Sequence, residues 1–435
     1  MSFLERQFKL QENRTTVKTE IIAGITTFMT MSYIIFVNPS ILSATGMPVG
    51  AVMVATCVSA ALATFLMAFL ANYPIALASG MGLNAFFTFS VVLNPDMGIT
   101  WRMALAAIFI EGVIFVLLTL TKLRETIVNT IPKTLKIGIA SGIGLFIAFI
   151  GLQGAGIIVA DQAVLVKLGS FKNNVPTVLA MIGLILIVVL ECYKIKGSIL
   201  IGIVIITFAG VPLGIVQLPD SFVSVPPSVA PIFMQIDFSK IGDTTFWLIV
   251  FTFFFVDFFD TVGTLVGVCS RSGLLDEDGR LANAKGALMA DAVGTVAGAV
   301  LGTSTVTSYV ESAAGVAQGG RTGLTAAVTG ILFLAALFFT PVAGIIPTYA
   351  TAPALIVVGV YMMAGMRDLD FDDWTEFVPS ILAFFMMPFS YNIAVGIEFG
   401  IVSYVVIKTL TGKAKDVSWT MVGLTVLFVF KEICV

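Results

Sequence analysis

Long apolar segments follow one another from about Val17 to about Leu410, with short polar connections between them. An α-helix needs roughly 20 apolar residues to cross the ~30 Å hydrocarbon layer of a bilayer. Of all residues, 58% are hydrophobic and only 11% are charged, whereas a soluble domain carries about 25% charged residues. The sequence therefore predicts an all-α polytopic membrane protein.

We predict fourteen transmembrane segments in two sets of seven, separated by the Pro-rich, polar segment 217–243. The first set is predicted at 18–43, 51–72, 74–91, 101–121, 132–152, 175–192 and 197–216. The second set is predicted at 244–269, 284–300, 302–318, 322–343, 345–364, 376–389 and 392–410. Residues 417–431 are too short to span comfortably, so we expect them at the membrane interface or packed on the bundle.

The distribution of basic residues tests this arrangement. With the N-terminus in the cytoplasm, the predicted segments put all 23 Lys and Arg residues on the cytoplasmic side except Arg102, Lys167, Lys172 and Lys240. Cytoplasmic loops of membrane proteins carry such an excess. We therefore expect both termini in the cytoplasm, a plasma-membrane location such as the bacterial inner membrane, and no cleavable signal peptide.

The residue types present also limit the chemistry. The chain has no His, which excludes a His proton relay and most zinc or haem sites. Its four Cys residues are scattered without metal-like spacing, and we interpret them as core residues. No cofactor is expected.

The third segment of each set has an unusual composition. Segments 74–91 and 302–318 both open with small, polar or β-branched residues and favour a helix only in their second half. Because seven is odd, the two sets run in opposite directions, which permits an inverted repeat. Paired interrupted segments at matching positions indicate a transporter binding site. We expect short extended stretches there, followed by half-helices whose N–H groups point at the site.

Acidic residues inside the membrane need a reason, because a charge at the bilayer centre costs about 2.5–3.5 kcal/mol on insertion scales. No Lys or Arg occupies the middle of a predicted segment. Each carboxylate must therefore be protonated, hydrogen-bonded, or exposed to water or a cation. The six that we single out are Glu111, Asp257, Asp260, Asp291, Glu311 and Glu398.

Helical spacing groups some of these residues. Asp257 and Asp260 share one face with two Thr residues, and Glu311 shares another with Ser308. For each of these two helix faces, the alternative to a ligand-binding role is a structural hydrogen bond to a neighbouring helix. For Asp291, which lies among small residues, helix bracing and proton coupling both stay open. Glu111 and Glu398 stand alone on apolar faces, and we expect structural or interface roles for them.

A small, neutral, planar ligand with both N–H donors and ring acceptors suits these groups. Asn84 can donate or accept a hydrogen bond, and Phe86, Phe87 and Tyr309 could stack on a ring, with core packing as the alternative. The stretch "GMGLNAFF" lacks the Lys of a phosphate loop. The absence of Arg and Lys from the candidate site argues against a polyanion such as sulfate or phosphate.

The stretches "GITTFMTMSYIIFVNPSIL", "SGMGLNAFFTF", "FVDFFDTVGTLVG" and "LGTSTVTSYVESAAGVAQGGRTGLTA" resemble the AzgA-type purine permeases. These form a branch of the nucleobase–cation symporter-2 family, related to uracil and xanthine permeases. The resemblance implies a uracil-permease-like fold of 7+7 inverted repeats. Its implied parts are a cytoplasmic lead-in (1–17), a core domain (18–121 and 244–343), a gate domain (132–216 and 345–410), an extracytoplasmic loop (217–243) and a cytoplasmic or interfacial end (411–435).

The same resemblance implies roles for individual residues. Asp257 and Glu311 match the positions that hold the base, and Asn84 matches the Asn of the purine branch. Asp260 matches a second acid of the eighth segment. Thr261 stands where the uracil branch has a His, which agrees with the purine branch. We expect a proton to be carried by Asp257 or Asp260, with Asp291 as a further candidate.

The implied function is import of guanine, hypoxanthine or adenine by proton symport and an elevator-type cycle. Protons are favoured over Na⁺, and we expect a lipid bilayer but no nucleic acid as partner; the resemblance allows a homodimer. The alternatives are the same fold carrying uracil, xanthine or another heterocycle, an intramembrane aspartyl protease, and a base sensor that does not transport. Against the protease, Asp257 and Asp260 lie on one helix and no GxGD motif occurs.

Overall fold

The computed structural model describes residues 3–121, 132–161, 163–219, 221–272 and 283–434. Contacts divide the chain into two compact units. The first comprises residues 1–120 and 153–354, and the second comprises 121–152 and 355–435. Residues 153–216, which were assigned to the gate domain, belong to the first unit by contacts. The predicted core and gate domains are defined by how they would move during transport, which contacts do not test, so this division stays a prediction.

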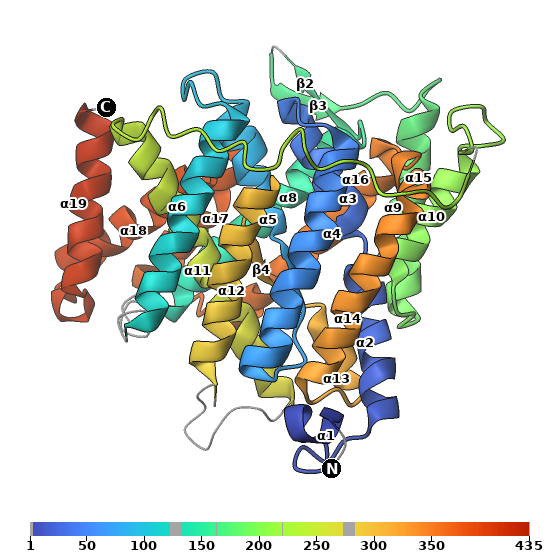
Figure 1. The fold of residues 1–435 in the computed structure, drawn as a ribbon. Coiled ribbons are helices and arrows are strands. Elements are labelled where there is room, and N and C mark those ends of the chain that lie inside the picture. Colours follow the sequence, from blue (N-terminus) through green and yellow to red (C-terminus); the bar gives the residue numbers. More distant parts are fainter. Residues whose placement is uncertain (1–2, 122–131, 162, 220, 273–282, 435) are drawn as a thin grey trace. The chain divides into compact units, whose positions relative to one another are not determined.

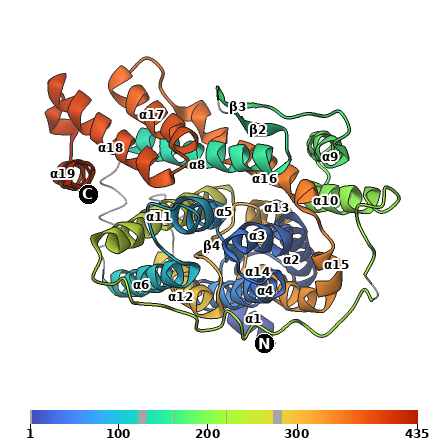
Figure 2. The same cartoon turned by 90° about the horizontal axis from the view of Figure 1, so that it is seen from above.

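The first unit is a bundle of helices with two short pairs of strands (Figure 1). Its N-terminal helices are α1 (Phe3–Phe8), α2 (Val17–Met31), α3 (Ile34–Leu42), α4 (Val49–Leu66), α5 (Met81–Ala85) and α6 (Trp101–Leu120). Its later helices are α9 (Val175–Cys192), α10 (Ser198–Ala209), α11 (Thr244–Ser272), α12 (Ala284–Leu301), α13 (Ser312–Ala317), α14 (Gly323–Ala336) and α15 (Thr340–Gly344). Helix α4 packs against α12 and α14, α14 also packs against α2, and α12 against α6 (Figure 2).

The two interrupted segments meet inside this unit. Strand β1 (Leu77–Ser79) pairs antiparallel with β4 (Val306–Ser308), with Ala78 opposite Thr307. Helix α5 and a π-helix (Phe86–Val92) follow β1, and α13 follows β4. The pairing provides hydrogen-bond partners for extended backbone buried among helices, which a membrane requires. The predicted extended stretches in both segments are confirmed.

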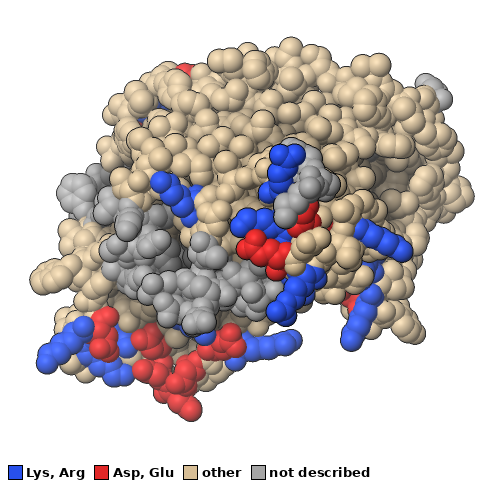
Figure 3. Space-filling view, turned by 60° about the horizontal axis from the view of Figure 1, so that its bottom comes forward, with Lys and Arg blue, Asp and Glu red and all other residues tan. Residues whose placement is uncertain are grey.

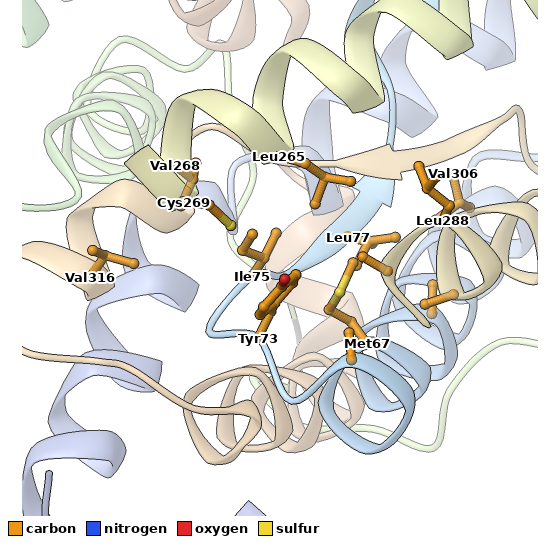
Figure 4. Close-up of a cluster of buried hydrophobic side chains, with 14 residues drawn as sticks. Met67, Tyr73, Ile75, Leu77, Leu265, Val268, Cys269, Leu288, Val306 and Val316 are labelled. Atoms are coloured by element: carbon orange, nitrogen blue, oxygen red, sulfur yellow. The ribbon is translucent and has the colours of Figure 1, made fainter. Parts of the chain in front are cut away.

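A buried apolar cluster packs beside the paired strands (Figure 4). Leu77 of β1 and Val306 of β4 contribute to it, together with Met67, Leu265 and Leu288 from neighbouring segments. Gly302, in the left-handed region at φ 93°, ends α12 and lets the chain turn toward β4. Apolar packing and a glycine turn thus hold the strands at a defined place among the helices.

The second strand pair and the long connection lie outside the helices of the first unit. Strands β2 (Ile158–Asp161) and β3 (Leu165–Leu168) form an antiparallel hairpin with mostly exposed residues. The described residues of segment 217–243 contain no helix or strand, in agreement with the predicted polar loop. Backbone hydrogen bonds tie this segment to the bundle, for example from Met234 N to Val300 O at 2.8 Å.

The second unit contains α8 (Lys133–Gly154, to residue 152), the end of α16 (Thr348–Met362), α17 (Trp374–Ser390), α18 (Ile393–Leu410) and α19 (Trp419–Cys434). An ion pair joins the buried Lys408 of α18 to the half-buried Glu376 of α17 at 2.6 Å. Thr134 of α8 and Tyr404 of α18 also hydrogen-bond to Glu376. Helix α19 packs against α18, in agreement with packing on the bundle.

Among the described residues, nine helices are long and apolar enough to cross a membrane, and three shorter helices are apolar. The first predicted segment contains two helices, because Ser32 and Tyr33 separate α2 from α3. Figure 3 brings the bottom of Figure 1 forward. The charged side chains gather on that face, and most of the remaining surface in Figure 3 is uncharged. The helical fold class is as predicted, and the count of fourteen segments stays a prediction.

Candidate functional site

Glu311 lies immediately before the first residue of α13, where the second interrupted segment becomes helical. The Tyr33 hydroxyl donates a hydrogen bond of 2.5 Å to Glu311 Oε1. Close packing of α13 on α2 creates this contact: a Cβ at Gly315 would lie 2.1 Å from Thr27 Oγ1. The absence of a side chain at residue 315 therefore allows Tyr33, just beyond the end of α2, to reach the carboxylate.

Asp257 of α11 and Asp291 of α12 are both fully buried, and a single hydroxyl joins them. Thr261 Oγ1 lies 2.7 Å from Asp291 Oδ1 and 3.4 Å from Asp257 Oδ1. It also lies 2.7 Å from Thr307 Oγ1 of β4. Two carboxylates and two hydroxyls from three elements thus form one polar cluster beside the paired strands.

Asp260 lies one helical turn beyond Asp257 on α11 and is half-buried. It interacts electrostatically with both Asp291 and Glu311. The structure therefore brings Asp257, Asp260, Asp291 and Glu311 into one region of the first unit, although α11, α12 and α13 are separated in sequence.

Asn84 lies in α5 directly after β1 and is fully buried. The hydroxyls of Ser79 and Ser304 both donate to its Oδ1, Ser79 at 2.8 Å. Its amide nitrogen has no hydrogen-bond partner among the described residues. Asn84 is thus held by both interrupted segments, since Ser79 belongs to the first and Ser304 to the second.

Of the three aromatic residues that were expected to stack on a ligand, Tyr309 and Phe86 contact other protein groups. Tyr309 donates from its hydroxyl to Ser79 O at 2.5 Å and from its backbone N–H to Ala76 O, so it ties the interrupted segments together. Phe86 is buried and lies edge-to-face with Phe253 at 4.9 Å between ring centroids. Phe87 is fully buried. These contacts are structural, and the stacking role stays a prediction.

Glu111, for which a structural or interface role was expected, has a partner in the second interrupted segment. Thr305, which precedes β4, donates a hydrogen bond of 3.1 Å to Glu111 Oε2. Glu111 of α6 therefore binds the second interrupted segment, a contact between residues 194 positions apart that helical spacing could not reveal. Glu398 is buried in α18, in the second unit, and its expected structural role stays a prediction.

Sequence reasoning missed Glu20, a fully buried carboxylate in the first turn of α2. It accepts hydrogen bonds from the backbone N–H groups of Arg321, Thr322 and Thr325 and from the Thr325 hydroxyl, at 2.6–3.3 Å. Glu20 thus caps α14 from another helix. The available signal was a lone acid near the start of the predicted segment 18–43.

Comparisons with known proteins agree with this architecture. Residues 18–399 match the profile of the Permease family. The chain is 51% identical to a putative permease (MJ0326) of Methanocaldococcus jannaschii over 99% of this chain and 98% of the relative. It is 44% identical to the adenine permease AdeP of Escherichia coli, covering 98% of this chain and 95% of the relative. It is 46% identical to the guanine/hypoxanthine permease PbuG of Bacillus subtilis, covering 97% and 98% respectively.

The fold also matches a solved structure. The transmembrane domain of a cyanobacterium bicarbonate transporter, BicA, superimposes with a TM-score of 0.66 at 17% sequence identity. The match covers 87% of this chain and 97% of that chain. At this level of identity the likeness establishes the fold alone, and it confirms the predicted fold class. The full-length matches to permeases exclude the intramembrane protease. The chain belongs to the Permease family, and it is a multi-pass membrane transporter and not an enzyme.

Proposed function

We propose that the protein imports purine nucleobases, with guanine, hypoxanthine and adenine as the candidate substrates. One observation carries the proposal: Asn84 and Glu311 lie on the two interrupted segments, directly after strands that pair with each other. Relatives named as adenine and guanine/hypoxanthine permeases, at 44% and 46% identity over nearly the whole chain, support the purine class.

The proposed recognition uses hydrogen bonds and no ionic clamp. A nucleobase carries N–H donors for the Glu311 carboxylate and ring or carbonyl acceptors for the Asn84 amide. Asp257 supplies a second acceptor from α11. The helix N-terminus of α13 favours negative charge next to it, which helps a carboxylate at residue 311 to remain in a hydrophobic chain.

We infer that a proton is the coupled ion. Asp257 and Asp291 contact one hydroxyl, that of Thr261, and both are buried. Two adjacent buried carboxylates repel each other when both are ionised, and a proton shared between them relieves this repulsion. Asp260, which interacts with Asp291 and Glu311, would link proton binding to the site that holds the base.

The energetic gain of such coupling is adequate for uptake. A membrane potential of 100 mV acting on one proton supplies about 2.3 kcal/mol, which corresponds to roughly 50-fold accumulation. We propose that the site alternates between the two sides of a bacterial inner membrane by an elevator-type movement, with both termini in the cytoplasm.

Uptake of radiolabelled adenine, guanine, hypoxanthine and uracil tests the proposal. The protein would be expressed in cells that lack their own base permeases, with and without a protonophore. We expect accumulation of at least one purine that collapses with the protonophore. Uptake of uracil alone would instead support the alternative cargo, and saturable binding without flux would support a sensor. Accumulation insensitive to the protonophore but dependent on Na⁺ would refute proton coupling.

A further inference from the structure

Tyr33 reaches Glu311 from outside the two interrupted segments, since it lies between α2 and α3. We propose that Tyr33 is a positioning residue for base recognition: its hydroxyl occupies Oε1 of Glu311 and thereby presents the other oxygen, Oε2, to an N–H group of a nucleobase. The proposal rests on the proposed purine transport, and it gives a residue of the first predicted segment a role in specificity.

The Tyr33 side chain is a rigid donor. It is fully buried and is among the largest side chains without exposed surface. Its backbone begins α3, because the Tyr33 carbonyl accepts hydrogen bonds from Phe36 N at 3.1 Å and from Val37 N at 3.0 Å. A tyrosine has few side-chain torsions, and close packing around a buried ring fixes them. The hydroxyl is therefore held at one place relative to α3.

The Glu311 side chain has more torsions and is the partner that needs to be held. An ionised carboxylate has no hydrogen to donate, so the Tyr33 hydroxyl is the donor in the 2.5 Å contact. Hydroxyl–carboxylate hydrogen bonds of about 2.5–2.7 Å are charge-assisted and stronger than neutral ones. Glu311 is half-buried, whereas Tyr33 is fully buried. A second partner can therefore reach the carboxylate from the accessible side.

Backbone contacts place residue 311 beside α2 independently of the carboxylate. Thr30 Oγ1, in the last turn of α2, lies 3.4 Å from Glu311 O. One turn further along, a Cβ at Gly315 would lie 2.1 Å from Thr27 Oγ1. Helix α13 thus packs directly on α2, and the separation of Tyr33 and Glu311 cannot grow unless these two helices move apart.

A carboxylate that is already held binds a base more tightly than one that is free to rotate. Without the hydrogen bond from Tyr33, Glu311 would sample several rotamers, and binding of a base would have to order it. With the hydrogen bond, this ordering is complete before the base arrives. Tyr33 therefore favours bases that present an N–H group to Glu311, and its effect passes through Glu311 without contact between Tyr33 and the base.

Methylated purines separate this role from a general effect on the fold, because a ring N-methyl group removes one N–H donor from the base. Equilibrium binding of radiolabelled adenine, guanine and hypoxanthine to the detergent-purified protein identifies a parent base. Competition by that base and by its series of ring-N-methylated derivatives then gives a dissociation constant for each. In the unmodified protein, we expect the derivative that lacks the N–H bound by Glu311 to bind at least about 10-fold more weakly than the parent base.

Tyr33→Phe removes the hydroxyl and keeps the buried ring. We expect it to weaken binding of the parent base about 10-fold and to leave binding of that one derivative nearly unchanged. The ratio of their dissociation constants should therefore fall about 10-fold, while the ratios for derivatives methylated elsewhere stay the same. Gly315→Ala keeps the Tyr33 hydroxyl but forces α13 away from α2, so it should reduce the same ratio. It provides a second variant if Tyr33→Phe does not reach the membrane.

Two controls match these variants. The Tyr349 hydroxyl, in α16, is buried and has no hydrogen-bond partner among the described residues. Tyr349→Phe should therefore leave every dissociation constant unchanged. A Cβ at Gly344, in α15, would meet no described atom within 4 Å, so Gly344→Ala is the control for Gly315→Ala.

The change of ratio at one methylated position is the deciding quantity, since a structural defect weakens the parent base and all derivatives alike. Unchanged binding of the parent base in both Tyr33→Phe and Gly315→Ala would overturn the proposal, and so would equal weakening of the parent base and every derivative. Equal binding of the parent base and every derivative by the unmodified protein would also overturn it, while purine transport would stand. Absence of purine binding and uptake in the unmodified protein would refute the proposed function as well.

Discussion

Replacing Glu20 by Ala removes a carboxylate that accepts four hydrogen bonds at the start of α14. Three come from the backbone N–H groups of Arg321, Thr322 and Thr325, and the fourth from the Thr325 hydroxyl. Arg321 and Thr322 lie just before α14, and Thr325 lies in its first turn. The N–H groups of a first turn have no carbonyl four residues earlier in the helix, so Glu20 supplies acceptors where the helix begins. Glu20 is fully buried, so water cannot readily replace it.

The size of the effect follows from these contacts. Each buried donor left without a partner costs about 1–3 kcal/mol, and relaxation recovers part of the total. We therefore expect Glu20→Ala to lower the free energy of unfolding by roughly 3–5 kcal/mol. Glu20→Gln keeps the shape and one oxygen acceptor, and should cost roughly 1–2 kcal/mol.

The thermal midpoint of each detergent-purified variant, followed by size-exclusion chromatography after heating, ranks the variants by stability. Glu12→Ala is the control, because the Glu12 side chain is 67% exposed and pairs only with the exposed Lys9 at 3.2 Å among the described contacts. Its expected cost is about 0–1 kcal/mol. A midpoint for Glu20→Ala equal to that of Glu12→Ala would refute the capping role.

Asp257→Ala and Glu311→Ala should each abolish uptake while leaving membrane expression intact, as measured by transport and immunoblotting; normal uptake by both would refute the site. Asp260→Asn should impair proton-driven accumulation more than exchange of labelled for unlabelled base, and an equal loss of both would remove its coupling role. Hydrogen bonds from Thr375 and Lys413 lower the pKa of Asp373 to about 2, so its contribution to stability is present above about pH 4 and disappears as the pH falls toward 2. Asp373→Asn should accordingly lower the thermal midpoint at pH 7 and lose that effect near pH 2; a midpoint difference independent of pH would contradict this.

Local sequence was enough to predict the elements and the kind of site. Long apolar segments predict helices because a membrane-spanning helix needs about 20 apolar residues, whatever its neighbours are. The small and β-branched residues before Asn84 and Glu311 predicted extended backbone, and β1 and β4 occur there. Because no Lys or Arg occupies the middle of a predicted segment, the sequence also indicated that Asp257, Asp291 and Glu311 need hydrogen-bond partners.

Tertiary structure decided which groups those partners are. Thr261 of α11 reaches Asp291 on α12, Tyr33 reaches Glu311 from 278 positions away, and Glu20 reaches Thr325 from 305 positions away. Helical periodicity reports which face of a helix is apolar, but it contains no information about which residue of another helix packs against that face. For the contact between Tyr33 and Glu311, the absence of a side chain at Gly315 matters because it allows α13 to approach α2 closely. The sequence thus determined the helices and the acids, and packing determined the partners of the acids.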